Sequence, residues 1–189
     1  MSPTAVLGGA WRVLRRHARA AWLTAAAVTL LNTVPDVVRQ VLVWDDPSVP
    51  HAVLVDVVGF STALVAQLWL TGALAGLPTG DGVRPAGALR RGTGLAVRAV
   101  RRAPAAVLAG VLTGGAVSAL ITVPASVAAL GAARVLGPLD DPSAGAFAVA
   151  AVSDVLASWV TLPWLAVVLV LAGSATGGWT ERGPGTRSG

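Results

Sequence analysis

Four long segments of this chain are almost free of charged side chains, and they constrain its fold more than any other feature. They run over residues 18–38, 51–77, 104–133 and 145–172. About 20 helical residues cross the hydrocarbon core of a bilayer. Because the backbone in lipid must form its hydrogen bonds internally, we expect these segments to be helices. The sequence therefore predicts an all-α polytopic membrane protein with four transmembrane helices.

The arginines in the connections between the apolar segments predict how the segments are oriented in the membrane. Hydrophobic residues make up 54% of the 189 residues and charged residues only 12%, against about 25% charged in soluble domains. All 14 basic residues are arginines: four lie in the N-terminal segment, six between the second and third apolar segments and two in the C-terminal tail, whereas the alternate connections hold only two. The positive-inside rule places the side with twelve arginines in the cytoplasm.

Both termini are then cytoplasmic, and the two connections with Asp-Asp-Pro face outward. We expect residues 1–174 to form one transmembrane domain and residues 175–189 a disordered cytoplasmic tail. The basic start and the first apolar segment are not followed by a small-residue cleavage site, which indicates an uncleaved first span rather than a signal peptide.

Two groups of arginines have helical spacing. At 100° per residue each group covers one side of a helix, which predicts two basic amphipathic helices in the headgroup region. Gly92 and Gly94 weaken the second, so its regular part is expected to begin near Leu95. The expected contacts of anionic lipid are Arg12, Arg15, Arg16, Arg19, Arg91, Arg98, Arg101 and Arg102. Charge that only sets topology, without an ordered helix, is the open alternative, and no nucleic-acid motif accompanies the charge.

The two halves of the chain, residues 8–78 and 90–174, resemble each other. Each runs from an arginine pair through an apolar span to Val-Pro, and then to "WDDPS" at 44–48 or "LDDPS" at 139–143. This pattern is typical of a parallel internal repeat, although the spacing between the shared features differs between the halves. Pro35 and Pro124 are expected to end or kink their spans near the outer face.

Three aspartates are candidate functional residues. Asp56 and Asp154 lie in the outer halves of their spans, where an interfacial position or a helix cap at Ser153-Asp154 is the main interpretation. A buried carboxylate pair is the alternative. Asp36 lies three residues before Arg39, a spacing that favours a local ion pair.

Other polar and small residues are expected to serve packing. Gln67 is expected to form a hydrogen bond between helices, and the pairs Gly72/Gly76 and Gly110/Gly114 to allow close helix approach within one chain or in a homodimer. The chain has no cysteine and no lysine, and its two histidines lie on opposite sides, so no metal site and no cofactor are predicted.

The order of these elements resembles a bacterial family. "AWRVLRRH" leads into a span, and "ALRRGTGLAVRAVRRAPAAVLAGVLTGG" lies in mid-chain before a Gly- and Leu-rich span. Over residues 10–130 this resembles the membrane domain found with some glycerophosphodiester phosphodiesterases, and its stand-alone relatives. The Pro-Gly turn of that family is replaced here by Pro124-Ala125. The resemblance implies a membrane domain and carries over no catalytic residues.

Three hypotheses for function follow. The first is a non-enzymatic protein of the cytoplasmic membrane with an accessory role, whose arginine faces contact lipids or a protein partner. The second is a small intramembrane enzyme acting on a lipid or isoprenoid, similar in size to membrane terpene cyclases, in which Asp36, Asp56 or Asp154 transfers a proton. The third is an exporter or immunity subunit. The absence of a convergent acid–base set in the sequence favours the first.

Overall fold

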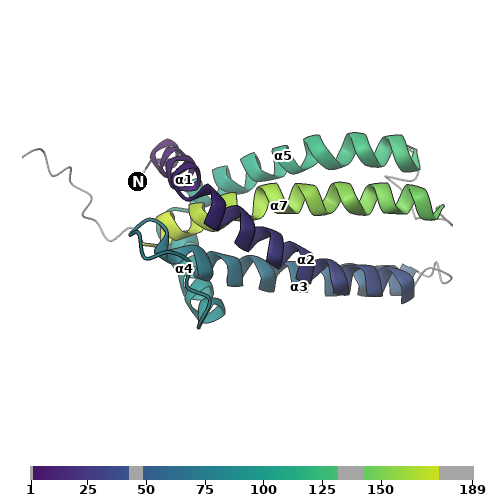
Figure 1. The fold of residues 1–189 in the computed structure, drawn as a ribbon, viewed down its shortest axis with the longest axis horizontal. Helices are drawn as coiled ribbons and strands as arrows, with labels where there is room; N and C mark the ends of the chain where they lie inside the picture. The colour runs from purple at the N-terminus through teal and green to yellow at the C-terminus, as the bar shows by residue number, and fades with distance from the viewer. Residues whose placement is uncertain (1, 43–48, 132–142, 175–189) are drawn as a thin grey trace, which may run out of the picture.

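All regular secondary structure in the part that the structure describes is helical. The computed structural model describes residues 2–42, 49–131 and 143–174, except the side chains at 36, 39–42, 49, 51, 52, 55, 56, 130 and 147. The elements are α1 (Pro3–Arg16), α2 (Ala18–Leu42), α3 (Val49–Ala73), a 3-10 turn η1 (Leu74–Gly76), α4 (Ala88–Arg102), α5 (Pro104–Leu130) and α7 (Ala144–Ser174) (Figure 1). The all-α prediction is confirmed for these residues.

Long helices form the body of the molecule, and short helices gather at one end. In Figure 1, α2, α3, α5 and α7 run along the long axis, with α1 and α4 at the end where α2 and α5 begin. α7 is the central helix, because it contacts α1, α2, α3, α4 and α5. The packing of α4 against α3, and of α7 against α1, α2 and α3, joins the two halves of the chain.

The helix starts have ordinary local causes. The Ser2 hydroxyl accepts a hydrogen bond from the Ala5 amide at 3.3 Å, and Pro3 occupies the first turn of α1. Pro104 opens α5 in the same way, directly after the last arginine of α4. The Ser143 hydroxyl accepts from the Ala146 amide at 3.3 Å at the start of α7. Ser153 and Asp154 therefore lie inside α7, and the expected cap at that pair is wrong.

The prolines do not end their helices. α2 continues past Pro35 to Leu42, and α5 continues past Pro124 to Leu130. α7 contains a third internal proline, Pro163. Of the two expected effects of Pro35 and Pro124, an end of the helix is therefore wrong, and a kink stays a prediction. A proline removes one hydrogen bond of the helix ladder, and membrane helices tolerate that loss.

Three helices of the described chain are long and apolar enough to cross a membrane. They contain the stretches Val57–Gly76, Pro104–Ala129 and Ala144–Ser174. α2, which holds the first expected span, is not among them, and polar residues such as Asn32 and Asp36 interrupt its second half. The finding agrees with a membrane protein, and the number of spans that it gives is three rather than four.

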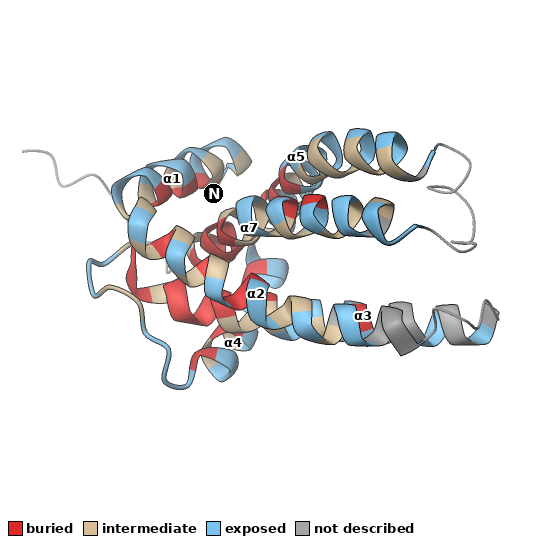
Figure 2. Ribbon diagram, turned by 45° about the vertical axis from the view of Figure 1, so that its right-hand side comes forward, coloured by how far each residue is buried: buried red, intermediate tan, exposed pale blue. Residues whose placement is uncertain are grey.

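Apolar side chains cover the outside of the long helices. Leu31, Phe60 and Leu120 are 74%, 73% and 76% exposed. In Figure 2 the buried residues gather near α1 and α4, whereas exposed positions dominate the opposite halves of the long helices. Contiguous exposed apolar surface of this kind needs an apolar environment, which a bilayer provides.

Helices α1 and α4 are amphipathic, as predicted, but each buries one side in the protein. Val6, Ala10 and Leu14 of α1 are buried, and Gly9 would meet Leu171 of α7 at 3.2 Å if it carried a Cβ atom. The buried residues of α4 are Ala88, Gly92, Leu95 and Ala99. The two helices are thus built into the bundle, and the side turned away from the bundle carries arginines.

Glycines set the crossing between α3 and α4. A Cβ atom on Gly72 would lie 1.8 Å from the Ala88 carbonyl oxygen, and one on Gly92 would lie 1.8 Å from the Leu68 carbonyl oxygen. A hydrogen in place of each side chain lets the two backbones touch. α4 begins at Ala88, so the expectation of a regular helix only from Leu95 is wrong. Gly92 weakens local propensity and is needed for packing.

Glycines allow close contact between helices of the same chain. A Cβ atom on Gly110 of α5 would lie 2.8 Å from Val168 of α7, and one on Gly173 of α7 would lie 2.4 Å from the Leu95 carbonyl oxygen. Gly72 and Gly110 thus serve packing inside one chain, which confirms that interpretation of the small-residue pattern for these two positions.

Candidate functional site

The arginine-rich end of the molecule is the first candidate site. Arg12, Arg15 and Arg16 are exposed on α1, and Arg19 is exposed in the first turn of α2. On α4 the exposed arginines with no hydrogen bond or ion pair to described residues are Arg90, Arg101 and Arg102. This surface, which we call the arginine face, consists of Arg12, Arg15, Arg16, Arg19, Arg90, Arg101 and Arg102.

The arginine face has little acidic compensation among the described residues. Asp81, in the turn after α3, is the acid at this end, and its carboxylate lies 3.8 Å from the guanidinium of Arg84. Asp81 also accepts a hydrogen bond from the Thr79 hydroxyl at 2.9 Å. Both members of the Arg84–Asp81 pair are more than half exposed, so the pair is weak. The net positive charge of this end is therefore available to an anionic ligand.

Two of the predicted lipid contacts, Arg91 and Arg98, have hydrogen-bond partners within the protein. The Arg91 guanidinium donates from Nε to the Gly72 carbonyl at 2.9 Å, from one terminal nitrogen to the Ala86 carbonyl at 3.2 Å, and from the other to the Arg84 carbonyl. Arg91 thus ties α4 to the end of α3 and to the turn between them. Arg98 donates from Nε to the Gly173 carbonyl of α7 at 3.3 Å. We therefore leave both residues out of the arginine face.

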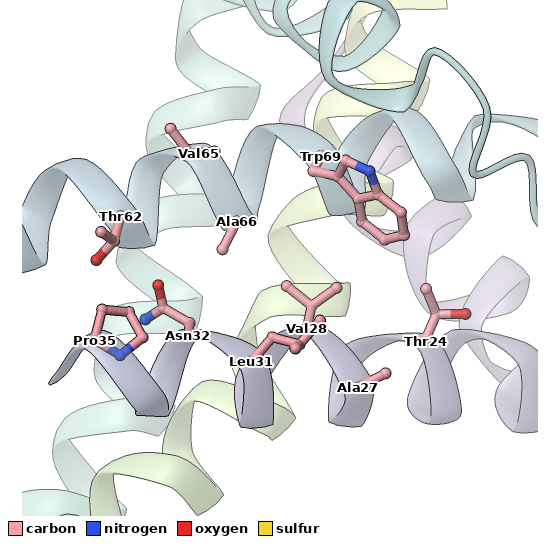
Figure 3. Close-up of a pocket in the computed structure, with 10 residues that line it drawn as sticks. All are labelled: Thr24, Ala27, Val28, Leu31, Asn32, Pro35, Thr62, Val65, Ala66 and Trp69. Atoms are coloured by element: carbon pink, nitrogen blue, oxygen red, sulfur yellow. The ribbon is translucent and has the colours of Figure 1, made fainter. Parts of the chain in front are cut away.

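A pocket of about 360 Å³ lies between α2 and α3. Figure 3 shows the two helices antiparallel, with Thr24 opposite Trp69 at one end and Asn32 and Pro35 opposite Thr62 at the other. Val28, Leu31 and Ala66 line the space between them. The pocket is apolar apart from the Asn32 amide and two threonines.

A second pocket, of about 270 Å³, lies where α1 and α2 meet α5 and α7. Three tryptophans from three helices line it, and we call it the tryptophan pocket. Its lining residues are Trp11, Leu14, Trp22, Thr113, Gly114, Val117, Val160, Thr161 and Trp164. Trp164 packs between helices, because its indole nitrogen donates to the Thr113 hydroxyl at 3.0 Å and lies 3.3 Å from the Gly110 carbonyl of α5.

Side-chain hydrogen bonds join α7 to the neighbouring helices α2 and α3. The Trp159 indole nitrogen donates to the Trp22 carbonyl at 2.9 Å, which joins α7 to α2. The Gln67 amide donates to the Leu162 carbonyl at 3.4 Å, which joins α3 to α7 and confirms the predicted interhelical bond. The same amide lies 3.3 Å from the Thr71 hydroxyl. Gln67 is buried, so its polar group is used for packing.

Of the three candidate aspartates, only Asp154 has a side chain among the described residues. Asp154 is exposed on α7 and interacts with another residue. Asp36 lies in α2 and Asp56 in α3, but their side chains are outside the described residues, as is the side chain of Arg39. Among the described residues, no group of three or more His, Asp or Glu side chains is placed to hold a metal ion. The proton-transfer hypothesis thus gains no geometric support.

Comparison with protein-family models, with curated proteins and with solved structures finds no match to this chain. The resemblance to the membrane domain of glycerophosphodiester phosphodiesterases stays a prediction from the sequence motifs. Function is therefore argued from the geometry of the arginine face and the two pockets.

Proposed function

We propose that the chain is a four-span protein of the cytoplasmic membrane, with both termini in the cytoplasm. Support for the fourth span comes from the position of α1, which contacts α5 and α7 at the same end as α4. α2 leads away from that end, antiparallel to α3 (Figure 3). If α2 did not cross the bilayer, α1 and α4 would be on opposite sides of the membrane.

The proposed role is that of an accessory protein that binds anionic phospholipid headgroups, or an acidic partner at the membrane surface, through the arginine face. The observation that carries this proposal is a set of exposed arginines that have no partner among the described residues, next to helices with exposed apolar surfaces. Each arginine near an anionic bilayer surface contributes roughly 1 kcal/mol. A cationic face beside an apolar belt is therefore suited to the inner leaflet of a bacterial membrane.

The topology can be tested with single cysteines, because the native chain contains none. Ala5, Ala86 and Ala144 are exposed, in α1, in the turn before α4 and at the start of α7. In intact cells, an impermeant thiol reagent is expected to label Ala144→Cys and to leave Ala5→Cys and Ala86→Cys unlabelled until the cells are lysed. Labelling of Ala5→Cys alongside Ala144→Cys would show that α2 does not cross the membrane.

Lipid binding can be tested with Arg101 and Arg102, which are exposed and have no partner among the described residues. Changing both to Gln is expected to lower retention of phosphatidylglycerol about tenfold, since two surface charges are lost. Retained lipid would be measured by mass spectrometry after purification from micelles with equal phosphatidylglycerol and phosphatidylcholine. The control changes both residues to Lys, which keeps the charge and should keep most of the binding. Equal retention by the Gln and native proteins would contradict the proposal.

A further inference from the structure

We propose that the tryptophan pocket binds one acyl chain of an anionic phospholipid, with the lipid phosphate at Arg15 and Arg19. This inference rests on the proposed function and adds to it a defined site and a ligand class. Elsewhere on the arginine face, contact with lipid needs no pocket. At this place an apolar pocket occurs together with arginines that have no partner in the described part of the chain.

The charges are arranged around the pocket in a simple way. Arg15 follows Trp11 by four residues on α1, and Arg19 precedes Trp22 by three residues on α2, so each arginine lies one turn from a tryptophan of the lining. Both arginines are exposed, with no hydrogen bond or ion pair to the described part of the chain. Since α2 leads away from the arginine end, Arg19 lies nearer that end than Trp22. A phosphate held there would have its acyl chains directed toward the pocket.

The lining of the pocket favours an apolar occupant. Its two hydroxyl groups are already used, because Thr113 donates to the Ala109 carbonyl and Thr161 to the Ala157 carbonyl, both at 2.8 Å. The Trp164 indole nitrogen is satisfied by Thr113. The donors of Thr113, Thr161 and Trp164 therefore need no polar ligand.

The size and walls of the pocket fit part of one chain. Its volume of about 270 Å³ is just below the range of about 300–1,000 Å³ that is usual for drug-sized ligands. Trp164 is fixed by its bond to α5, and the backbone of Trp22 is bonded to Trp159 of α7. The Trp164 side chain and the Trp22 backbone are thus held in place, whereas Trp11 is 55% exposed on the short helix α1. Tryptophan is also the residue that membrane proteins favour at the level of the headgroups.

The pocket between α2 and α3 carries a weaker argument. Its polar end, at Asn32, lies far along α2 from Arg19, and the Asn32 side chain already has an interaction partner. The tryptophan pocket is the one of the two with unpaired cations within a helical turn of its lining.

The test uses a matched pair of glycines on α5. Gly114 lines the pocket, and a Cβ atom there would meet Trp164 at 3.5 Å, an ordinary contact. Gly115 is exposed and a Cβ atom there would meet nothing within 4 Å. Each variant replaces one glycine of α5 by leucine, but only Gly114→Leu fills the pocket.

Affinity for the first bound dioleoyl phosphatidylglycerol would be measured by native mass spectrometry on the full chain, with phosphatidylcholine and glycerol phosphate as comparison ligands. We expect Gly114→Leu to raise the Kd for phosphatidylglycerol about tenfold, the equivalent of about two buried methylene groups, and Gly115→Leu to leave it unchanged. Glycerol phosphate should compete weakly, because it has no acyl chain. Equal Kd values for the two folded glycine variants, or full competition by glycerol phosphate, would overturn the inference.

Two double arginine variants provide a second test of the site if Gly114→Leu does not fold. Arg15→Gln with Arg19→Gln is expected to raise the Kd for phosphatidylglycerol about tenfold or more, and Arg12→Gln with Arg16→Gln, which removes the same charge, less than about threefold. Equal losses in the two pairs would overturn the assigned site. If Arg101→Gln with Arg102→Gln weakens lipid retention while the pocket variants do not, the inference fails and the proposed function stands. If the native protein does not prefer phosphatidylglycerol, the proposed function fails as well.

Discussion

Replacing Gly92 by alanine is expected to lower the free energy of unfolding by about 3 to 5 kcal/mol, or to prevent folding. The added methyl group would lie 1.8 Å from the Leu68 carbonyl oxygen and 2.8 Å from the Gly72 amide nitrogen. Both contacts are backbone atoms of α3, so no side-chain rotation relieves them. α4 would have to move away from α3, and its contacts with α7 would be lost with it.

The control is Gly94→Ala on the same helix. A Cβ atom at Gly94 would meet a terminal nitrogen of Arg98 at 3.4 Å, the far end of a flexible side chain. Because alanine has the higher helix propensity, this change should be neutral or stabilise by up to about 1 kcal/mol. Thermal unfolding in detergent, followed by circular dichroism, compares the two. Similar melting temperatures for both variants would show that the tight α3–α4 crossing is absent.

The helices themselves could be predicted from the sequence because their causes are local. Segments of apolar residues and the spacing of arginines gave the long helices and the two amphipathic helices. Pro35 and Pro124 show the limit of local reasoning, because a proline weakens a helix without deciding whether it ends there. Trp44 and both Asp-Asp pairs lie outside the described residues, so the predictions for the outer connections, like the internal repeat and the disordered tail, remain predictions.

The candidate site was less predictable, because tertiary contacts divide residues that look alike in the sequence. Gly92 reads as a weak point of a helix, yet it is where two backbones touch. Trp11, Trp22 and Trp164 are far apart in the chain, and nothing in their spacing indicates that they line one pocket. For the same reason Thr113 was not singled out, and Gly114 was predicted only to allow close helix approach. Periodicity identifies the face of a helix but not the partner of that face.

Replacing Arg91 by glutamine is expected to lower the free energy of unfolding by about 2 to 4 kcal/mol, because three charge-assisted hydrogen bonds to backbone carbonyls are lost. One acceptor is the carbonyl of Gly72 in the last turn of α3, a place where a helix leaves carbonyls without internal partners. The other two belong to Arg84 and Ala86 in the turn between α3 and α4. Thermal unfolding in detergent measures the effect.

Arg90 provides the matched control, since it is the neighbouring arginine, is exposed and has no partner among the described residues. Arg90→Gln removes the same charge and should shift the melting temperature little. Arg91→Lys keeps the charge but cannot present the planar fork of a guanidinium, so it should be destabilised nearly as much as Arg91→Gln. If Arg91→Lys were as stable as the native protein while Arg91→Gln and Arg90→Gln fell together, charge rather than geometry would be the cause. Arg91 would then belong to the arginine face, as the sequence predicted.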